Sequence, residues 1–121
     1  MEIVKTEAQE RAIVQKLVDT AWPSLNPVVG QVLGRGGQAT VYADGHSEAL
    51  KVIDTSVYRD PARRKDANRR GRSEIYYHQQ LTAKTDTVVR LFDTASIPLS
   101  RERGQDAPMC FLLRMELLTP L

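Results

Sequence analysis

The feature that most constrains the fold is a glycine-rich segment between two β-rich pieces. Gly34, Gly36 and Gly37 separate the pieces Val28–Leu33 and Thr40–Ala43. Glycine permits close approaches that a Cβ would block, so glycines at this spacing indicate a loop with accessible backbone amides. A dinucleotide-binding or Walker loop must run from a strand into a helix, and no Gly-Lys-Ser/Thr follows here. The segment therefore has the strand-loop-strand form.

Turn signals and hydrophobic periodicity define the other elements. The tight-turn dipeptide Asp44-Gly45 leads into a third strand, and Pro61 stands at a suitable first position of a long helix. In chain order we expect a helix at Thr6–Trp22, strands at Val28–Leu33, Thr40–Ala43 and Ala49–Ile53, a long helix at Ala62–Ala83, and strands at Val88–Ile97 and Met109–Leu118. This order predicts an α+β fold: a five-stranded antiparallel sheet with one long helix and an additional N-terminal amphipathic helix.

The N-terminal helix has a clear start and stop. Thr6 and Gln9 form a capping-box pattern, and apolar residues then recur at helical spacing until Pro23. We assign residues 1–27 to this helix and a linker, and residues 28–121 to the domain that follows. The apolar side of the helix either packs onto that domain or docks to a partner, and the sequence does not separate these alternatives.

Composition excludes several classes of protein. With 121 residues and a formal net charge of +2, the chain has the size of one globular domain and is not a polyanion binder as a whole. Its single cysteine, Cys110, excludes an internal disulfide and falls in an apolar run, where a core position is expected. No window approaches the ~20 apolar residues that span a bilayer. We therefore expect a cytoplasmic protein with no membrane partner.

Lys51 and Glu74 are the candidate functional charges. Lys51 stands in the middle of the apolar run Ala49–Ile53, where an unpaired ammonium would be costly to bury. A phosphate pair and a carboxylate from the following helix would satisfy it, and Glu74 is the carboxylate that we select. Taken singly, each residue is typical of a surface salt bridge. Together with the glycine loop, their order favours a phosphate-binding function.

These motifs give the sequence a resemblance to a known family. The glycine loop with Val41, the motif Ala49-Leu50-Lys51, Glu74 in the long helix and the run Leu113–Leu118 occur in the order seen in eukaryotic-like serine/threonine protein kinases. Over residues 28–121 the chain is similar to the ATP-binding small lobe, or N-lobe, of that family. It departs from the pattern at Ala39, which replaces the third loop glycine, and at Gln38, which replaces an aromatic residue.

The resemblance implies a role for each matching residue. Lys51 would hold the α and β phosphates of ATP, and Glu74 would orient Lys51, so these two form the catalytic pair. The backbone of Glu116 and Leu118 would hydrogen-bond adenine as the hinge, and Met115 would stand behind the adenine pocket. The implied nucleotide-binding residues are Leu33, Gly34, Gly36, Gly37, Val41, Ala49, Lys51, Met115, Glu116 and Leu118.

The resemblance also implies what must come from elsewhere. In the family, the magnesium ligands and the carboxylate that orients the attacking hydroxyl lie in the His-Arg-Asp and Asp-Phe-Gly motifs of a second lobe, the C-lobe, and neither motif occurs here. The implied cofactor is ATP with Mg²⁺ bound by that C-lobe. We therefore expect the 121-residue chain alone to be inactive. Its implied partners are a kinase C-lobe, in the same longer chain or in a separate protein, and a protein substrate.

Other interpretations stay open. The chain is alternatively a non-catalytic, kinase-like interaction or regulatory module. Its exposed nucleotide slot would also favour a homodimer through that face. A basic cluster near the start of the long helix is typical of a solvated face or of a contact with a phosphorylated activation segment, and without interleaved aromatic residues we expect no nucleic-acid partner. The cluster consists of Arg59, Arg63, Arg64, Lys65, Arg69, Arg70 and Arg72.

Overall fold

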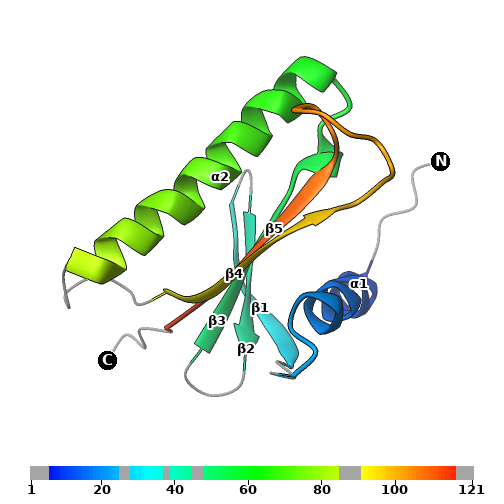
Figure 1. Ribbon diagram of the computed structural model, residues 1–121. Helices are drawn as coiled ribbons and strands as arrows, with labels where there is room; N and C mark the ends of the chain where they lie inside the picture. Colours follow the sequence, from blue (N-terminus) through cyan, green and yellow to red (C-terminus); the bar gives the residue numbers. More distant parts are fainter. Residues whose placement is uncertain (1–5, 25–27, 37–38, 45–47, 85–90, 117–121) are drawn as a thin grey trace.

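The structure is a computed structural model that describes residues 6–24, 28–36, 39–44, 48–84 and 91–116, and at 78–84 and 91 it describes the backbone alone. Its elements are α1 (Glu7–Ala21), β1 (Val29–Arg35), β2 (Ala39–Asp44), β3 (Glu48–Asp54), the short 3₁₀ helix η1 (Thr55–Val57), α2 (Pro61–Lys84), β4 (Leu91–Pro98) and β5 (Met109–Glu116). The strands form one antiparallel five-stranded sheet in the order β1-β2-β3-β5-β4. Figure 1 shows α1 and α2 on opposite sides of this sheet.

The predicted α+β class, the antiparallel sheet and the two helices are confirmed. Boundaries of the described elements lie within a few residues of their predicted positions. The turn at Asp44-Gly45 was expected to join β2 to β3, and only its first residue lies in the described part of the chain. Residues 88–90 and 117–118, predicted as strand ends, also lie outside it. Among the described helices, none is long and apolar enough to cross a membrane.

The capping box of α1 forms as predicted. The Thr6 hydroxyl accepts a hydrogen bond from the Gln9 N–H at 3.2 Å, and the Gln9 side chain accepts one from the Thr6 N–H at 2.9 Å. These bonds satisfy backbone donors that the first helical turn leaves without intrahelical partners. Further along α1, Val14 and Val18 are buried against the sheet. Of the two alternatives for this helix, packing onto the domain is the one observed.

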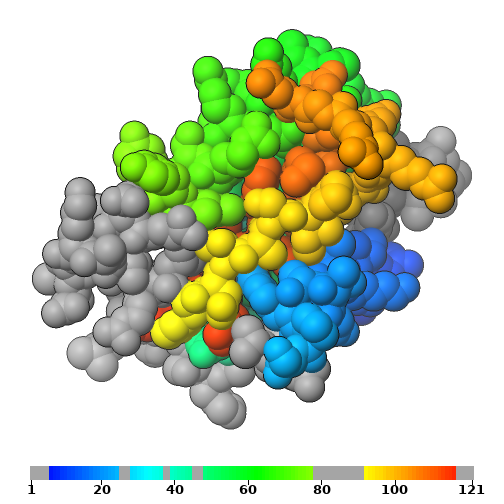
Figure 2. Space-filling model, viewed as in Figure 1, coloured from blue at the N-terminus to red at the C-terminus, as the bar shows by residue number. Residues whose placement is uncertain are grey.

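The strand register divides the sheet into two faces. Leu50 of β3 pairs with Arg114 of β5, and the next position, Lys51, pairs with Leu113. Because successive side chains on a strand point to opposite faces, Leu50 lies on the α1 side and Lys51 on the α2 side. The α1 side holds the larger core cluster, and in Figure 2 the blue surface of α1 adjoins the yellow surface of β4. The buried members of that cluster are Val14, Val18, Val29, Tyr42, Leu50, Val52, Cys110 and Leu112.

Candidate functional site

The lysine and the glutamate selected from the sequence are paired in the structure. Lys51 lies in mid-strand on β3, with Val41 of β2 and Leu113 of β5 as its cross-strand partners. The carboxylate of Glu74, on α2, forms an ion pair with the Lys51 Nζ. The two side chains are 25% and 29% exposed. Since an ammonium carries three N–H donors, Lys51 can bind a second anion beside Glu74.

Three further predicted residues share the face of Lys51. Directly opposite residues of antiparallel strands point to the same face, as do alternate residues along one strand. Val41 is opposite Lys51, while Ala49 precedes Lys51 by two positions and is opposite Met115. Ala49 is buried, and Val41 and Met115 are half-buried. We call the surface formed by Val41, Ala49, Lys51 and Met115 the slot face.

The glycine loop closes tightly beside the slot face. The Gly36 N–H donates a hydrogen bond to the Ala39 carbonyl oxygen at 2.8 Å. Gly34 is paired with Val41, so a side chain at Gly34 would point to the slot face. A Cβ built on Gly34 meets no atom of the described residues within 4 Å, and the backbone therefore borders open space there. Gly37, the third predicted loop glycine, lies outside the described residues.

The other predicted site residues that the structure describes lie outside the slot face. Leu33 on β1 has 42% of its surface exposed. Glu116 is the last residue of β5 and pairs with Glu48, whereas Leu118 lies outside the described residues. Described residues line a hollow beside the start of α2 and another between α1 and the glycine loop. No slot-face residue lines either of these hollows. The predicted residues that the structure clearly brings together are Val41, Ala49, Lys51, Glu74 and Met115.

Gly71 is a positioning residue that sequence reasoning missed. It appears in the sequence only as an exception in a helix-tolerant run, but in the structure it lies against Phe111. A Cβ at this position would stand 2.5 Å from Cδ2 of Phe111, whose side chain is fully buried. The missing side chain lets α2 approach the sheet closely. Glu74 follows about one helical turn later, which brings its carboxylate to Lys51.

Buried polar contacts hold the first half of α2 to the loop between β4 and β5. The Asn68 amide is fully buried, and its Nδ2 donates to the carbonyl oxygens of Gln105 and Ala107 at 2.9 and 2.8 Å. Before α2, at the start of η1, the Thr55 hydroxyl binds the first residue of β5: it donates to the Met109 carbonyl oxygen at 3.2 Å and accepts from the Met109 N–H at 2.9 Å. Figure 2 shows the orange β4–β5 loop lying over the green start of α2. The helix is thus anchored independently of the Lys51–Glu74 pair.

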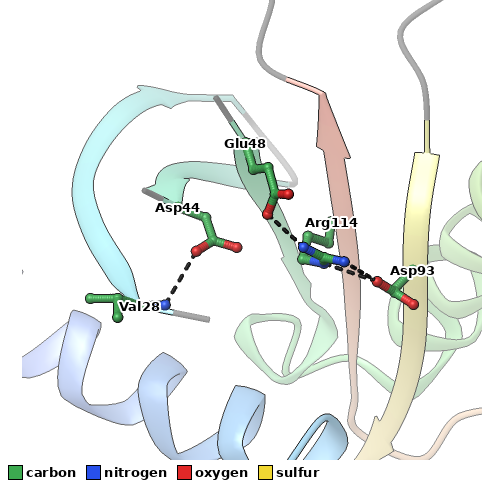
Figure 3. Close-up of polar contacts among 5 residues, drawn as sticks. All are labelled: Val28, Asp44, Glu48, Asp93 and Arg114. Carbon is green, nitrogen blue, oxygen red and sulfur yellow. Dashed lines mark hydrogen bonds and ion pairs between the residues drawn. The ribbon is translucent and has the colours of Figure 1, made fainter. Parts of the chain in front are cut away.

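Arg114 ties three strands together on the opposite face. Figure 3 shows its guanidinium between Glu48 of β3 and Asp93 of β4, with shortest N–O distances of 2.5 Å to each carboxylate. The guanidinium carbon also lies 5.3 Å from the centre of the Phe92 ring. Burial opposes the charged form, but hydrogen bonds to Asp93 and Glu48 outweigh it, and the pKa of Arg114 is raised. A lone arginine in an apolar strand was the sequence signal that could have identified this cluster.

The basic residues of α2 are partly neutralised within the helix. Asp66 forms ion pairs with Arg69 at 2.5 Å and with Arg70 at 2.6 Å. A hollow of about 320 Å³ beside them is lined by Ala62, Lys65, Asp66, Arg69, Arg72 and Gln105. None of these described lining residues is aromatic, so the hollow offers no surface on which a base would stack.

Cys110 is a core residue, as its apolar surroundings in the sequence predict. It is 1% exposed, and burial, followed by the nearby charge of Asp54, raises the pKa of its thiol to about 12. A thiol that stays protonated is a poor nucleophile and a poor metal ligand. Within the part of the chain that the structure describes, no group of three or more His, Cys, Asp or Glu side chains is placed to hold a metal ion.

Comparison with known proteins adds no family assignment. No protein-family model matches the sequence, and no curated protein matches it.

Proposed function

We propose that this chain is the ATP-binding N-lobe of a serine/threonine-type protein kinase, which transfers the γ-phosphate of ATP to a protein hydroxyl when a C-lobe completes it. The observation that carries the proposal is the Lys51–Glu74 ion pair on the slot face, next to the glycine loop. An ion pair between a central strand and the helix packed over it supplies a fixed cation where phosphates would lie. The chain's topology, with five antiparallel strands and α2 on one face, is compatible with such a lobe.

The residues present fit a nucleotide. Open space at the Cβ position of Gly34 leaves the backbone at Gly34 accessible from the slot face, on which a phosphate would lie. Ala49 and Val41 offer a small, apolar surface to a flat base, and Met115 borders it. Bound ATP would supply the transferable phosphoryl group. Lys51 would neutralise phosphate charge, and Glu74 would keep its ammonium in place.

The same proposal defines the partners. The C-lobe, from a longer chain or from a separate protein, would provide the Mg²⁺ ligands and the residue that orients the substrate hydroxyl. A protein substrate would bind at the junction of the two lobes, and we place the completed enzyme in the cytoplasm. In the absence of a C-lobe, a second copy of this chain would cover the slot face. A concentration-dependent increase in mass by analytical ultracentrifugation would support this homodimer, and a monomer at high concentration would oppose it.

The decisive experiment is a calorimetric titration of the chain with Mg·ATP. We expect binding by the native chain and at least about tenfold weaker binding by Lys51→Ala, because a hydrogen bond to a charged group contributes roughly 1.5–3 kcal/mol. The matched control is Lys65→Ala, which removes a lysine from the exposed part of α2. Its affinity should equal that of the native chain.

The outcomes separate the proposed function from its alternatives. Loss of binding in Lys65→Ala but not in Lys51→Ala would place the anion on the basic face of α2 and contradict the proposal. An absence of ATP binding by the native chain would favour a non-catalytic interaction module instead. For the enzyme completed by its C-lobe, Lys51→Ala should abolish phosphate transfer, and full activity in that variant would exclude the kinase assignment.

A further inference from the structure

Polar side chains of α1 bind N–H groups at the β1 edge of the sheet. β1 is an edge strand, and an edge strand leaves N–H groups without a neighbouring strand to accept them. The Val29 N–H donates to Oε1 of Gln15 at 2.9 Å, and the Val32 N–H donates to Oε1 of Glu7 at 3.1 Å. Both acceptors belong to α1, which Figure 1 shows next to β1. The helix therefore holds the strand that leads into the glycine loop.

A third contact reaches the loop itself. Arg35 ends β1 immediately before Gly36, and its Nη2 lies 2.6 Å from Oε2 of Glu10 on α1. Arg35 is paired with Thr40, which neighbours Val41 on β2, so Arg35 points away from the slot face and toward α1. The hydrogen bond from Arg35 to Glu10 raises the pKa of the guanidinium. The cation at the start of the loop is thus directed at the helix and not at the face proposed for the nucleotide.

A hollow separates part of α1 from the described residues of the glycine loop. A cavity of about 310 Å³ lies between them and is bordered by Glu10, Ile13 and Val14 on the helix side and by Arg35, Gly36 and Ala39 at the loop. Ile13 is 43% exposed, so the helix is not packed tightly at this point. Across the cavity, the Glu10–Arg35 ion pair connects helix and loop. Loss of the pair would release the loop without removing buried apolar surface.

We propose that Glu10 is a positioning residue for the nucleotide site, which it serves through Arg35 by holding the glycine loop in place from the back of the sheet. This inference rests on the proposed nucleotide binding. A loop that is held before ATP arrives loses less conformational freedom on binding, and affinity rises accordingly. Displacement of α1 by another protein would lower ATP affinity by the same route.

The first test measures amide hydrogen exchange by NMR in the absence of nucleotide. In Glu10→Gln and in Arg35→Gln, the Gly36 amide should exchange several-fold faster, because its bond to Ala39 closes the loop. The Val29 amide, held by Gln15, should change little. Glu102→Gln makes the same chemical change at an exposed position of the β4–β5 loop and serves as the control. Native exchange at Gly36 in both α1-loop variants would overturn the inference.

The second test is a double-mutant cycle on Mg·ATP affinity. Each single variant, Glu10→Gln or Arg35→Gln, should bind about two- to fivefold more weakly, as expected for a partly exposed ion pair, and the double variant should be no weaker than either single one. Adenosine, which has no phosphates for the loop to contact, should bind all four proteins alike. Additive effects would mean that Arg35 acts on ATP through its own charge, and would overturn the inference.

Failure of the proposed function is distinguishable from failure of this inference. A native chain that binds neither ATP nor adenosine removes the nucleotide site and with it the positioning role. A native chain that binds ATP, with unchanged affinity in the two single variants, leaves the proposed function intact and overturns the role of Glu10 alone.

Discussion

The two faces of the sheet differ in how completely they are covered. On the α1 face, Leu50 and Leu112 have no exposed surface, and the helix contributes apolar side chains directly above them. On the α2 face, the buried cluster is smaller, and Lys51 and Glu74 keep about a quarter of their side-chain surface exposed. One face thus buries apolar area, which is the main stabilising contribution to folding. The other carries partly exposed charge beside a glycine loop, a combination suited to binding.

A single strand contributes side chains to both faces of the sheet, because successive side chains point in opposite directions. β3 places Leu50 and Val52 toward α1, while Ala49, Lys51 and Ile53 face α2. A one-residue shift in register would exchange the two sets and put the lysine into the apolar core. The contacts of Arg114 with Glu48 and Asp93 join three strands near the end of this register and oppose such a shift. Stability and the candidate site are therefore coupled through strand register but use different side chains.

The largest expected effect comes from a cavity on the α1 face. Leu112→Ala removes a fully buried side chain and should lower the free energy of unfolding by roughly 2–5 kcal/mol, measured by urea denaturation. The Mg·ATP affinity of the protein that remains folded should be unchanged, because Leu112 points away from the slot face. Val57→Ala, at a position that is 66% exposed, is the control and should cost less than about 1 kcal/mol. A large loss of affinity in folded Leu112→Ala would show that the two faces are not separable.

An intermediate effect should follow from adding a side chain where α2 lies against the sheet. Gly71→Ala places a methyl group against Phe111, and we expect a loss of about 1–3 kcal/mol in the free energy of unfolding from overpacking. Unlike Leu112→Ala, it should also weaken Mg·ATP binding, because α2 must move and Glu74 moves with it.

Two variants make this prediction specific. Ser73→Ala lies on the same helix at an exposed position and should leave ATP affinity unchanged. Adding Phe111→Leu to Gly71→Ala should recover part of the lost affinity, because the smaller side chain gives the methyl group room. An unchanged Lys51–Glu74 pair in a crystal structure of Gly71→Ala would contradict the proposed dependence of Glu74 on Gly71.

The sequence predicted the parts of the structure that depend on local chemistry. Thr6 and Gln9 gave the start of α1, and the position of Lys51 in an apolar run led to Glu74 as its partner, which the structure shows. The contact of Gly71 with Phe111 was not predictable, since the two residues are far apart in the chain and a helical glycine has several possible causes. The Glu10–Arg35 pair was missed for the same reason. Contacts between elements depend on packing geometry that residue spacing does not encode.

The smallest expected effect concerns an acid on the α1 face. Asp44 is 7% exposed, and Figure 3 shows one of its carboxylate oxygens accepting a hydrogen bond from the Val28 N–H, at 3.2 Å. Burial raises the pKa of Asp44, the charge of Glu48 raises it further, and the Val28 hydrogen bond and the charge of Arg114 oppose the shift. Its other oxygen, Oδ2, is buried and has no hydrogen-bond partner among the residues that the structure describes. The ionised carboxylate is thus less favourable in the folded chain than in the unfolded chain.

The raised pKa of Asp44 determines how its contribution to stability changes with pH. Because the folded pKa lies above the ordinary value of 3.8, the folded state binds the proton more tightly, and the contribution of Asp44 to stability is lost as pH rises through the folded pKa. Asp44→Asn keeps an oxygen for the Val28 N–H and removes the charge. We expect it to raise the free energy of unfolding at pH 7 by at most about 1 kcal/mol, and by progressively less as pH falls toward the ordinary value. Asp106→Asn makes the same chemical change at an exposed position and is the control. A stability gain in Asp44→Asn that grew on acidification would mean that the Val28 hydrogen bond and the charge of Arg114 together outweigh burial at this acid. The α1 face would then tolerate charge as readily as the slot face does.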